Sequence, residues 1–308
     1  MSNLLAGTAC YLLASVFWGL NIPLTATLLT VFDPLWLSPY RYLIASTMLG
    51  AWVLVTLGPA QLGSPIPLRR VSLLSLAVAC FLVCFNIGLM LTHPVTAAAV
   101  IAGSPVYVAA VSRVMTGARL GKGFAGATVL TVIGAGIAIA GRADGQGLRL
   151  SGGEPLLVAS IASWTVYSIL AQRWFAPGVP QLRRTFLSSL FAIPWLLVFW
   201  MIARAAGWVG APYLVPVGRD LAYLLVTAVF CTALATVAWN IGVARLGIAA
   251  GGLWQNAVPV FAVLNSLLFV GVVPTGTQVA GGVMVMAGVA WMQWHAFRAS
   301  RGPAPAAA

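Results

Sequence analysis

The chain has 308 residues, of which 61% are hydrophobic and only 6% are charged, with a mean hydropathy of +1.00 and a formal net charge of +12. Soluble domains carry about 25% charged residues, so this composition excludes a water-exposed globular fold and indicates a membrane protein. The positive charge does not indicate nucleic-acid binding, because the basic residues stand at the ends of apolar segments and form no patch with stacking aromatics.

Turn signals and charged residues divide the sequence into ten apolar segments, each near the length of about 20 residues that a membrane-spanning helix needs. The first follows Met1-Ser2-Asn3, which lacks the basic start of a signal peptide, so we expect it to remain as a spanning helix. Most separators are short, which predicts that consecutive helices are neighbours. In chain order the predicted spans are 4–30, 35–57, 71–92, 95–115, 123–141, 154–175, 185–206, 219–243, 247–271 and 275–296.

The stretch 85–134 recurs 154 positions later without a gap. Asn86-Ile87-Gly88 aligns with Asn240-Ile241-Gly242, and Pro105-Val106 aligns with Pro259-Val260. Because each half holds an odd number of helices, five, the second half must cross the membrane in the opposite direction to the first. The sequence therefore predicts an all-α integral membrane fold of two inverted five-helix repeats around a central cavity, an arrangement that supports alternating access.

Basic residues set the expected orientation. With a cytoplasmic N-terminus, eleven of them lie at the inner ends of the predicted spans and four at the outer ends, so both termini are expected in the cytoplasm. The eleven are Arg69, Arg70, Arg113, Arg119, Lys122, Arg173, Arg183, Arg184, Arg245, Arg298 and Arg301, and the four are Arg142, Arg149, Arg204 and Arg219. The predicted organisation is a first repeat at 1–142, an outside linker at 143–153, a second repeat at 154–297 and a disordered cytoplasmic tail at 298–308.

Motifs spread over nearly the whole chain resemble those of the drug/metabolite transporter superfamily, in particular its ten-helix exporters with two duplicated five-helix domains. They are Phe17-Trp18-Gly19-Leu20-Asn21, Arg41-Tyr42-Leu43, Asn86-Ile87-Gly88, Ser104-Pro105-Val106 and Gly134-Ala135-Gly136, echoed by Ser163-Trp164, Trp239-Asn240-Ile241-Gly242 and Val258-Pro259-Val260. Within the superfamily, the chain looks most like the bacterial aromatic amino acid exporter. This resemblance implies export from the cytoplasm and a cavity lined by helices 1, 3, 4, 6, 8 and 9, with helices 5 and 10 outside that ring.

Candidate binding residues are the polar and aromatic side chains within the spans. In the first helix, Tyr11, Ser15 and Trp18 share one stripe with Asn21 at its edge, which suits either a wet cavity wall or a Ser/Thr packing face between helices. Prolines inside spans remove a backbone donor and are candidate kinks or hinges: Pro23, Pro105 and Pro259. The full predicted substrate-binding set is Tyr11, Ser15, Trp18, Asn21, Phe85, Asn86, Ser104, Tyr107, Trp164, Tyr167, Trp239, Asn240, Trp254, Gln255 and Asn256.

Two interpretations stay open for several of these residues. Asn86 and Asn240 occupy equivalent mid-helix positions, and each needs a hydrogen-bonding partner, either another helix or a substrate. The tryptophans Trp18, Trp164 and Trp254 fit an aromatic chamber that could stack on a bulky ligand. Aromatics near segment ends, such as Trp36 and Trp208, fit the interfacial belt instead.

Charge inside the spans is sparse. The only carboxylates are Asp33, Asp144, Glu154 and Asp220, all in loops or at helix ends, which argues against a cation/proton antiporter built on an intramembrane acid. Arg41 is the one basic residue well inside a span, and it either extends to the interface or meets a substrate carboxylate. His93 is interpreted as a loop contact. Cysteine spacing predicts no metal site, and no cofactor is expected.

The sequence therefore predicts an exporter of amino acids, aromatic and other large neutral ones, working by alternating access and compatible with uncoupled, facilitated transport. A site of hydroxyls, amides and aromatic faces can hold a zwitterion, which has no net charge. The alternative is a broad exporter of drugs or other metabolites. A membrane-embedded enzyme is disfavoured, because no nucleophile–base pair is apparent. We expect a multi-pass protein of the bacterial inner membrane, a monomer or weak homodimer, with small-molecule substrates and lipid as its partners.

Overall fold

A computed structural model describes residues 2–92, 94–117, 123–140, 150, 152–271 and 273–301. His93, most of the predicted linker 143–153 and residues 302–308 of the predicted tail lie outside the described residues. The described part consists of helices and their connections. In chain order the helices are α1 (Ser2–Leu28), α2 (Pro34–Leu57), the 3-10 turn η1 (Pro59–Gln61), α3 (Leu68–Leu91), α4 (Pro94–Ala102), α5 (Ser104–Thr116), α6 (Phe124–Ala140), α7 (Glu154–Arg173), α8 (Gln181–Ala205), α9 (Gly218–Val226), the π-helix η2 (Thr227–Leu234), α10 (Ala235–Leu246), α11 (Ile248–Gln255), α12 (Val258–Val270) and α13 (Gly276–Arg301).

These helices correspond to the ten predicted segments when three interrupted ones are each counted once: α4 with α5, α9 with η2 and α10, and α11 with α12. Within the described residues, six segments are long and apolar enough by themselves to cross a membrane, and the pair α4–α5, bent by 46°, makes a seventh. The other three, α6, α11–α12 and α13, are shorter or less apolar. The predicted all-helical membrane fold is confirmed.

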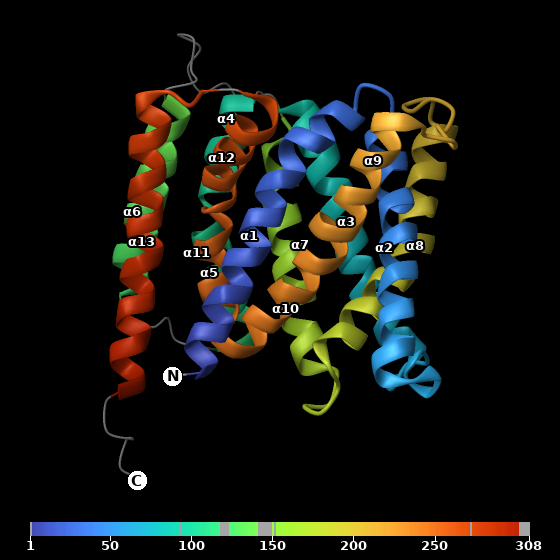
Figure 1. Cartoon of the computed structure of the whole chain (residues 1–308), viewed down its shortest axis with the longest axis horizontal. Helices are drawn as coiled ribbons and strands as arrows, with labels where there is room; N and C mark the ends of the chain where they lie inside the picture. The colour runs from blue at the N-terminus through green and yellow to red at the C-terminus, as the bar shows by residue number, and fades with distance from the viewer. Residues whose placement is uncertain are drawn as a thin grey trace.

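The segments run side by side across one slab, and both ends of the chain emerge at the same face of it (Figure 1). The last segments of the two halves, α6 and α13, pair with each other at one edge of the bundle (Figure 1). Their backbones approach closely: a Cβ added at Gly134 on α6 would lie 2.7 Å from the carbonyl oxygen of Gly281 on α13. Small residues permit such packing in membranes. The pair also packs against α4, α11 and α12, so it lies at the edge of the bundle and remains part of it.

Local sequence explains where the segments begin and break. Asp33 caps α2, its Oδ1 accepting hydrogen bonds from the backbone N–H groups of Leu35 (2.8 Å) and Trp36 (3.0 Å). The interruption between α4 and α5 falls at Gly103, two residues before Pro105. The interruption between α11 and α12 falls at Asn256-Ala257, two residues before Pro259. A proline two residues on lacks the N–H that would continue the ladder, so equivalent prolines break equivalent helices.

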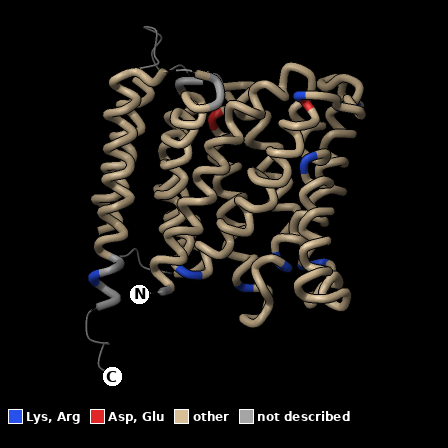
Figure 2. Tube along the Cα trace, viewed as in Figure 1, with Lys and Arg blue, Asp and Glu red and all other residues tan. Residues whose placement is uncertain are grey.

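Basic residues are distributed unequally between the two faces of the slab. Figure 2 shows Lys and Arg positions gathered at the face where the chain starts and ends. The helix bounds place Arg69, Arg113, Arg173 and Arg245 at this face, because each lies in the first or last turn of a helix that starts or ends there. Arg204 lies at the opposite face, in the last turn of α8.

Candidate substrate site between the two halves

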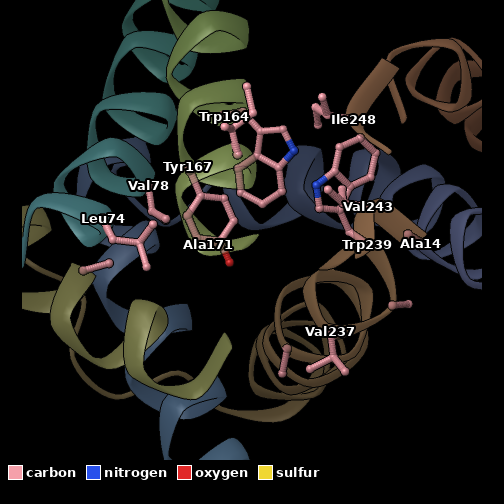
Figure 3. Close-up of a cluster of buried hydrophobic side chains, with 14 of the residues drawn as sticks. Ala14, Leu74, Val78, Trp164, Tyr167, Ala171, Val237, Trp239, Val243 and Ile248 are labelled. Atoms are coloured by element: carbon pink, nitrogen blue, oxygen red, sulfur yellow. The ribbon is translucent and has the colours of Figure 1, made fainter. Parts of the chain in front are cut away.

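An aromatic cluster fills the centre of the bundle, with Trp164 of α7 at its middle. The Trp164 ring centroid lies 5.6 Å from that of Trp18 (α1), 6.0 Å from Trp239 (α10) and 4.9 Å from both Tyr167 (α7) and Phe81 (α3). Figure 3 shows the Trp164 and Tyr167 rings together beside α7, with Trp239 facing Trp164 from the other side. Edge and tilted geometries at these distances are favourable aromatic contacts. Both halves contribute to this cluster.

Two contacts mark the axis that relates the halves. Trp18 and Trp164 hold corresponding places in the first helix of each repeat, and their rings touch. Asn256, 154 positions after Ala102, donates a hydrogen bond from Nδ2 to the Ala102 carbonyl oxygen at 3.0 Å. A residue can touch its own repeat equivalent only close to the symmetry axis. The aromatic cluster and the breaks in α4–α5 and α11–α12 therefore lie near this axis, where inverted-repeat transporters hold their ligands.

Several buried polar atoms in this region have no hydrogen-bonding partner among the described residues. They are the indole Nε1 atoms of Trp164 and Trp254, which are 3% and 4% exposed, and the Oε1 atom of Gln255. A buried donor or acceptor without a partner is costly and rare in native proteins. Trp254 and Gln255 end α11, beside the break, and Trp164 stands in the aromatic cluster. The two donors and one acceptor are what a polar ligand group would need.

Two residues of the polar stripe of α1 form hydrogen bonds that join this helix to the second half. Tyr11 Oη donates to the Gly247 carbonyl oxygen at 2.8 Å, and its ring contacts Trp239 at 5.2 Å. Ser15 Oγ donates to the Trp254 carbonyl oxygen at 3.1 Å, which ties α1 to the end of α11. Both side chains are buried. They hold α1 against the second half beside the aromatic cluster.

Further along α1, Asn21 and Thr25 hold a buried cation. Arg41 of α2, which is 8% exposed, donates from Nη1 to Asn21 Oδ1 at 2.9 Å and to Thr25 Oγ1 at 3.2 Å. Thr25 Oγ1 in turn donates to Asn21 Oδ1 at 3.0 Å. Arg41 therefore does not extend to the interface, one of the two roles that its sequence position allows.

The two equivalent asparagines are hydrogen bonded between helices. Asn86 Nδ2 donates to the Pro34 carbonyl oxygen at 3.0 Å and to Ser38 Oγ at 3.2 Å, both on α2. Asn240 is fully buried, and its Nδ2 donates to Tyr167 Oη at 2.8 Å and to Thr185 Oγ1 at 2.9 Å. The amide nitrogens of both residues thus join helices, while Asn240 Oδ1 has no partner.

The remaining predicted residues surround the helix breaks and the cluster. Ser104 is buried and donates to the Ile101 carbonyl oxygen, and the Tyr107 hydroxyl lies over Gly103 at the α4–α5 break. Phe85 is half-buried and reaches the cluster through Phe81, at 5.8 Å between centroids. Among the predicted hinges, Pro105 is buried, Pro23 is half-buried and Pro259 is exposed on the outside of the bundle.

Two features of this region are not in the predicted set. Phe81 stands one helical turn before Phe85, and this aromatic spacing of four on α3 was the available signal. The π-helix η2 packs against both α1 and α2, and its Phe230 ring lies 5.6 Å from Phe17. Such π-helical turns are frequent at functional sites. The alanines, threonines and cysteine of this stretch give no sequence signal for it.

Two inverted helical halves with an aromatic cluster between them are an architecture of membrane transporters. The EamA-like transporter family model matches the chain twice, over residues 5–140 and 151–294. The chain therefore belongs to the EamA-like transporter family, within the drug/metabolite transporter superfamily, and is a multi-pass membrane transporter. The two matches begin 146 residues apart, the same offset that separates Trp18 from Trp164.

Relatives agree with this family. The chain is 26% identical over 284 residues to the uncharacterized transporter YyaM of Bacillus subtilis (strain 168), covering 89% of each chain. It is 28% identical over 127 residues to the uncharacterized transporter YetK of the same organism, covering 41% of this chain and 37% of that one. A protein known from its crystal structure shares the fold with a TM-score of 0.79 over 95% of this chain and 98% of that one, at 20% identity. The comparisons support a transporter and not an enzyme, and they carry no substrate.

Proposed function

We propose that this transporter exports amino acids, preferring aromatic and other large neutral ones, by alternating access. The observation that carries the proposal is the central aromatic cluster, built from Trp18, Trp164 and Trp239 and bordered by buried polar atoms without partners. Apolar rings alone would bind any lipophilic molecule. Rings next to unused donors and acceptors select a ligand that has both an aromatic body and polar groups.

The proposed contacts follow from the chemistry of each group. A substrate ring would pack against the indoles of Trp18 and Trp164, which sit at the axis between the halves. Gln255 Oε1 is a hydrogen-bond acceptor and would serve the ammonium group of the substrate, while the Trp164 and Trp254 Nε1 groups are donors at the border of the ring site. The other predicted residues, among them Tyr11, Ser15, Asn240 and Asn256, would hold the helices that position these groups.

Alternating access would use the two helix breaks at the axis. Gly103 and Ala257 are equivalent points in the two halves, and Asn256 bridges them through the Ala102 carbonyl. Breaks of this kind allow one half to rock against the other around a fixed site. Pro105 and Pro259 hold these breaks open by lacking an amide donor, so we propose them as hinges, with Pro23 as a third in α1.

The orientation we propose places both termini in the cytoplasm of a bacterial inner membrane. Lys and Arg positions gather at the face where the chain starts and ends (Figure 2), and such a bias marks the cytoplasmic side. Single cysteines at Ser64, in the turn between α2 and α3, and at Gly210, after α8, should react from opposite sides of the membrane, with Ser64 inside. Labelling of both from one side would contradict the orientation.

The energy source we propose is the substrate gradient itself. The carboxylates within the described helices, Glu154 and Asp220, stand in first turns at helix ends and not inside the spans. Proton-coupled carriers of cations rely on acids at membrane depth. Transport without a proton gradient is therefore expected.

The test is uptake into proteoliposomes by the purified protein across all amino acids and several lipophilic cationic drugs, with and without an imposed pH gradient. Tryptophan and phenylalanine should be transported fastest, small amino acids slowly, and the pH gradient should change initial rates less than about twofold. Equal transport of drugs and amino acids would favour the broad exporter instead. Accumulation that occurs only with a pH gradient would contradict the uncoupled mechanism.

A further inference from the structure

We propose that Arg41 is the residue that recognises the carboxylate of the transported molecule, which makes this a carrier for carboxylates with an apolar body. The inference rests on the proposed function for the place of the aromatic ring. Arg41 lies in α2, inside a span, and both of its hydrogen bonds come from Nη1. Its Nε is buried without a partner.

The charge of Arg41 is not balanced by the protein within the described residues. Its partners, Asn21 Oδ1 and Thr25 Oγ1, are neutral oxygens, and no carboxylate of the described chain pairs with it. Asp33, the N-cap of α2, stands eight residues before Arg41, about 12 Å away along the helix axis, and its Oδ1 accepts the hydrogen bonds of the cap. A cation inside a span is expensive unless something pairs with it, so an intramembrane arginine of this kind marks a functional site.

The available edge of the guanidinium has the shape for a carboxylate. Arginine binds carboxylates through two parallel N–H groups, and the edge formed by Nε and Nη2 is one of the edges that does so. In Arg41 the Nη1 bonds to Asn21 and Thr25 fix the plane of the group, while the Nε side has no protein partner. A substrate carboxylate on that edge would supply both the missing hydrogen bonds and the missing negative charge.

The position suits a ligand whose ring lies in the aromatic cluster. Asn21, which holds Arg41, is three residues after Trp18 on α1, so the two side chains are neighbours on one helix face about 5 Å apart along the axis. A substrate whose ring lies against the Trp18–Trp164 pair would place its carboxylate about one helical turn along α1, at the level of Asn21 and Arg41. The π-helix η2 packs on both α1 and α2.

The second half of the molecule carries no charge at the position equivalent to Arg41. Tyr167 follows Asn21 by 146 residues, the same offset as between the paired tryptophans. Ser188 lies seven residues into α8, as Arg41 lies seven residues into α2. There the two equivalent helices are joined by a neutral hydrogen bond between Tyr167 Oη and Ser188 Oγ at 3.2 Å. The buried cation of the second half, Arg184, joins α8 to α7 nearer the helix ends, where its Nη1 donates to the Ala171 carbonyl oxygen at 3.0 Å and to Gln172 Oε1 at 3.1 Å. At the depth of Arg41, a neutral pair is sufficient in the second half, which leaves the charge of Arg41 to a ligand.

The test uses two ligands that differ in one group, 3-phenylpropionate and 3-phenylpropanamide. Thermal unfolding of the purified protein in detergent is followed with each ligand for the wild type, R41Q, R41K and R204Q. Arg204 is exposed at the end of α8 and serves as the matched control. We expect the propionate to stabilise the wild type and R204Q, to stabilise R41K less, because lysine cannot make the paired contact, and to leave R41Q unaffected.

Competition against labelled tryptophan in proteoliposomes gives the second measurement. The wild type should prefer tryptophan to tryptophanamide, and R41Q should reduce that preference about tenfold to hundredfold, as expected for a lost hydrogen bond to a charged group. If R41Q does not fold, R41K provides the same comparison. Stabilisation of R41Q by the propionate as strong as in the wild type would overturn the proposal. If a folded variant bound tryptophan and tryptophanamide more weakly by the same factor, the proposal would also be overturned, because Arg41 would then have a structural role.

The proposed function can fail separately. A wild type that transports no amino acid would overturn amino acid export, and the thermal measurement would then decide the carboxylate site alone. Stabilisation of the wild type by 3-phenylpropionate that is lost in R41Q would support the site, and lack of stabilisation of the wild type would overturn it.

Discussion

The two halves share one arrangement of helices but have diverged in the residues that face the proposed site between them. In the first half, α1 and α2 are joined by Asn21, Thr25 and the cation of Arg41. In the second half, the equivalent positions of α7 and α8 hold the neutral pair Tyr167–Ser188, and the buried cation Arg184 joins the two helices nearer their ends. Beside the aromatic cluster, the first half therefore supplies the charge, and the second supplies most of the aromatic surface. Such an asymmetric site can orient an amphipathic ligand. The symmetric arrangement of the helices allows the two halves to exchange between inward-open and outward-open states.

The asparagines of the aligned stretch illustrate the same divergence. Asn86 and Asn240 are identical and equivalent, yet Asn86 is half-buried and binds α2, whereas Asn240 is fully buried between Tyr167 and Thr185. Next to them, Phe85 contacts the cluster only through Phe81, while its equivalent Trp239 lies inside it and donates from Nε1 to Ser168 Oγ at 2.9 Å. One sequence motif thus has two structural roles.

The largest loss of stability is expected at the pairing of α6 and α13, where the two halves have equivalent glycines. Gly134 and Gly288 are equivalent, and a Cβ at either would meet the opposite helix at 2.7 Å. Gly134→Leu and Gly288→Leu should each cost about 3 kcal/mol or more of stability, because the added side chain meets backbone that cannot move aside. Thermal unfolding in detergent measures the loss.

Gly136 on α6 provides the control, since nothing lies within 4 Å of a Cβ built there. Gly136→Leu should unfold close to the wild-type temperature. If only one of Gly134→Leu and Gly288→Leu lost much thermal stability, the two halves would not be equivalent at this contact.

A smaller and unequal effect is expected at the asparagines. Asn240→Leu keeps the volume but leaves buried hydroxyls at Tyr167 and Thr185 without a donor, which should cost about 1–2 kcal/mol. Asn86→Leu should cost less than about 1 kcal/mol, because its partners on α2 are less enclosed. Equal losses of thermal stability in the two variants would contradict the divergence described above.

The sequence predicted the arrangement of the helices better than the contacts of the proposed site. Apolar length, odd helix number and the Asn-Ile-Gly and Pro-Val repeats were enough for two inverted halves, since these features are set by the membrane and by backbone chemistry. The aromatic cluster was predicted in part through Trp18 and Trp164. Sequence could not reveal that Phe81 completes it or that Asn86 donates to Pro34, because such partners depend on how helices rotate against one another. Arg41 was noticed as a charge in a span, but its neutral partners on α1 became apparent only in three dimensions.

The central claim, that the aromatic cluster around Trp164 holds the ring of the substrate and Arg41 holds its carboxylate, is tested most directly by a competition matrix. Wild type, W164A and R41Q are compared for two preferences: tryptophan over alanine, and tryptophan over tryptophanamide. Thermal unfolding checks that each variant is folded, since truncating a packed tryptophan can cost about 3–5 kcal/mol. The account predicts that W164A reduces the first preference about two- to tenfold and leaves the second unchanged, while R41Q does the reverse. If either folded variant reduces both preferences by the same factor, the division of the site between the two halves is contradicted.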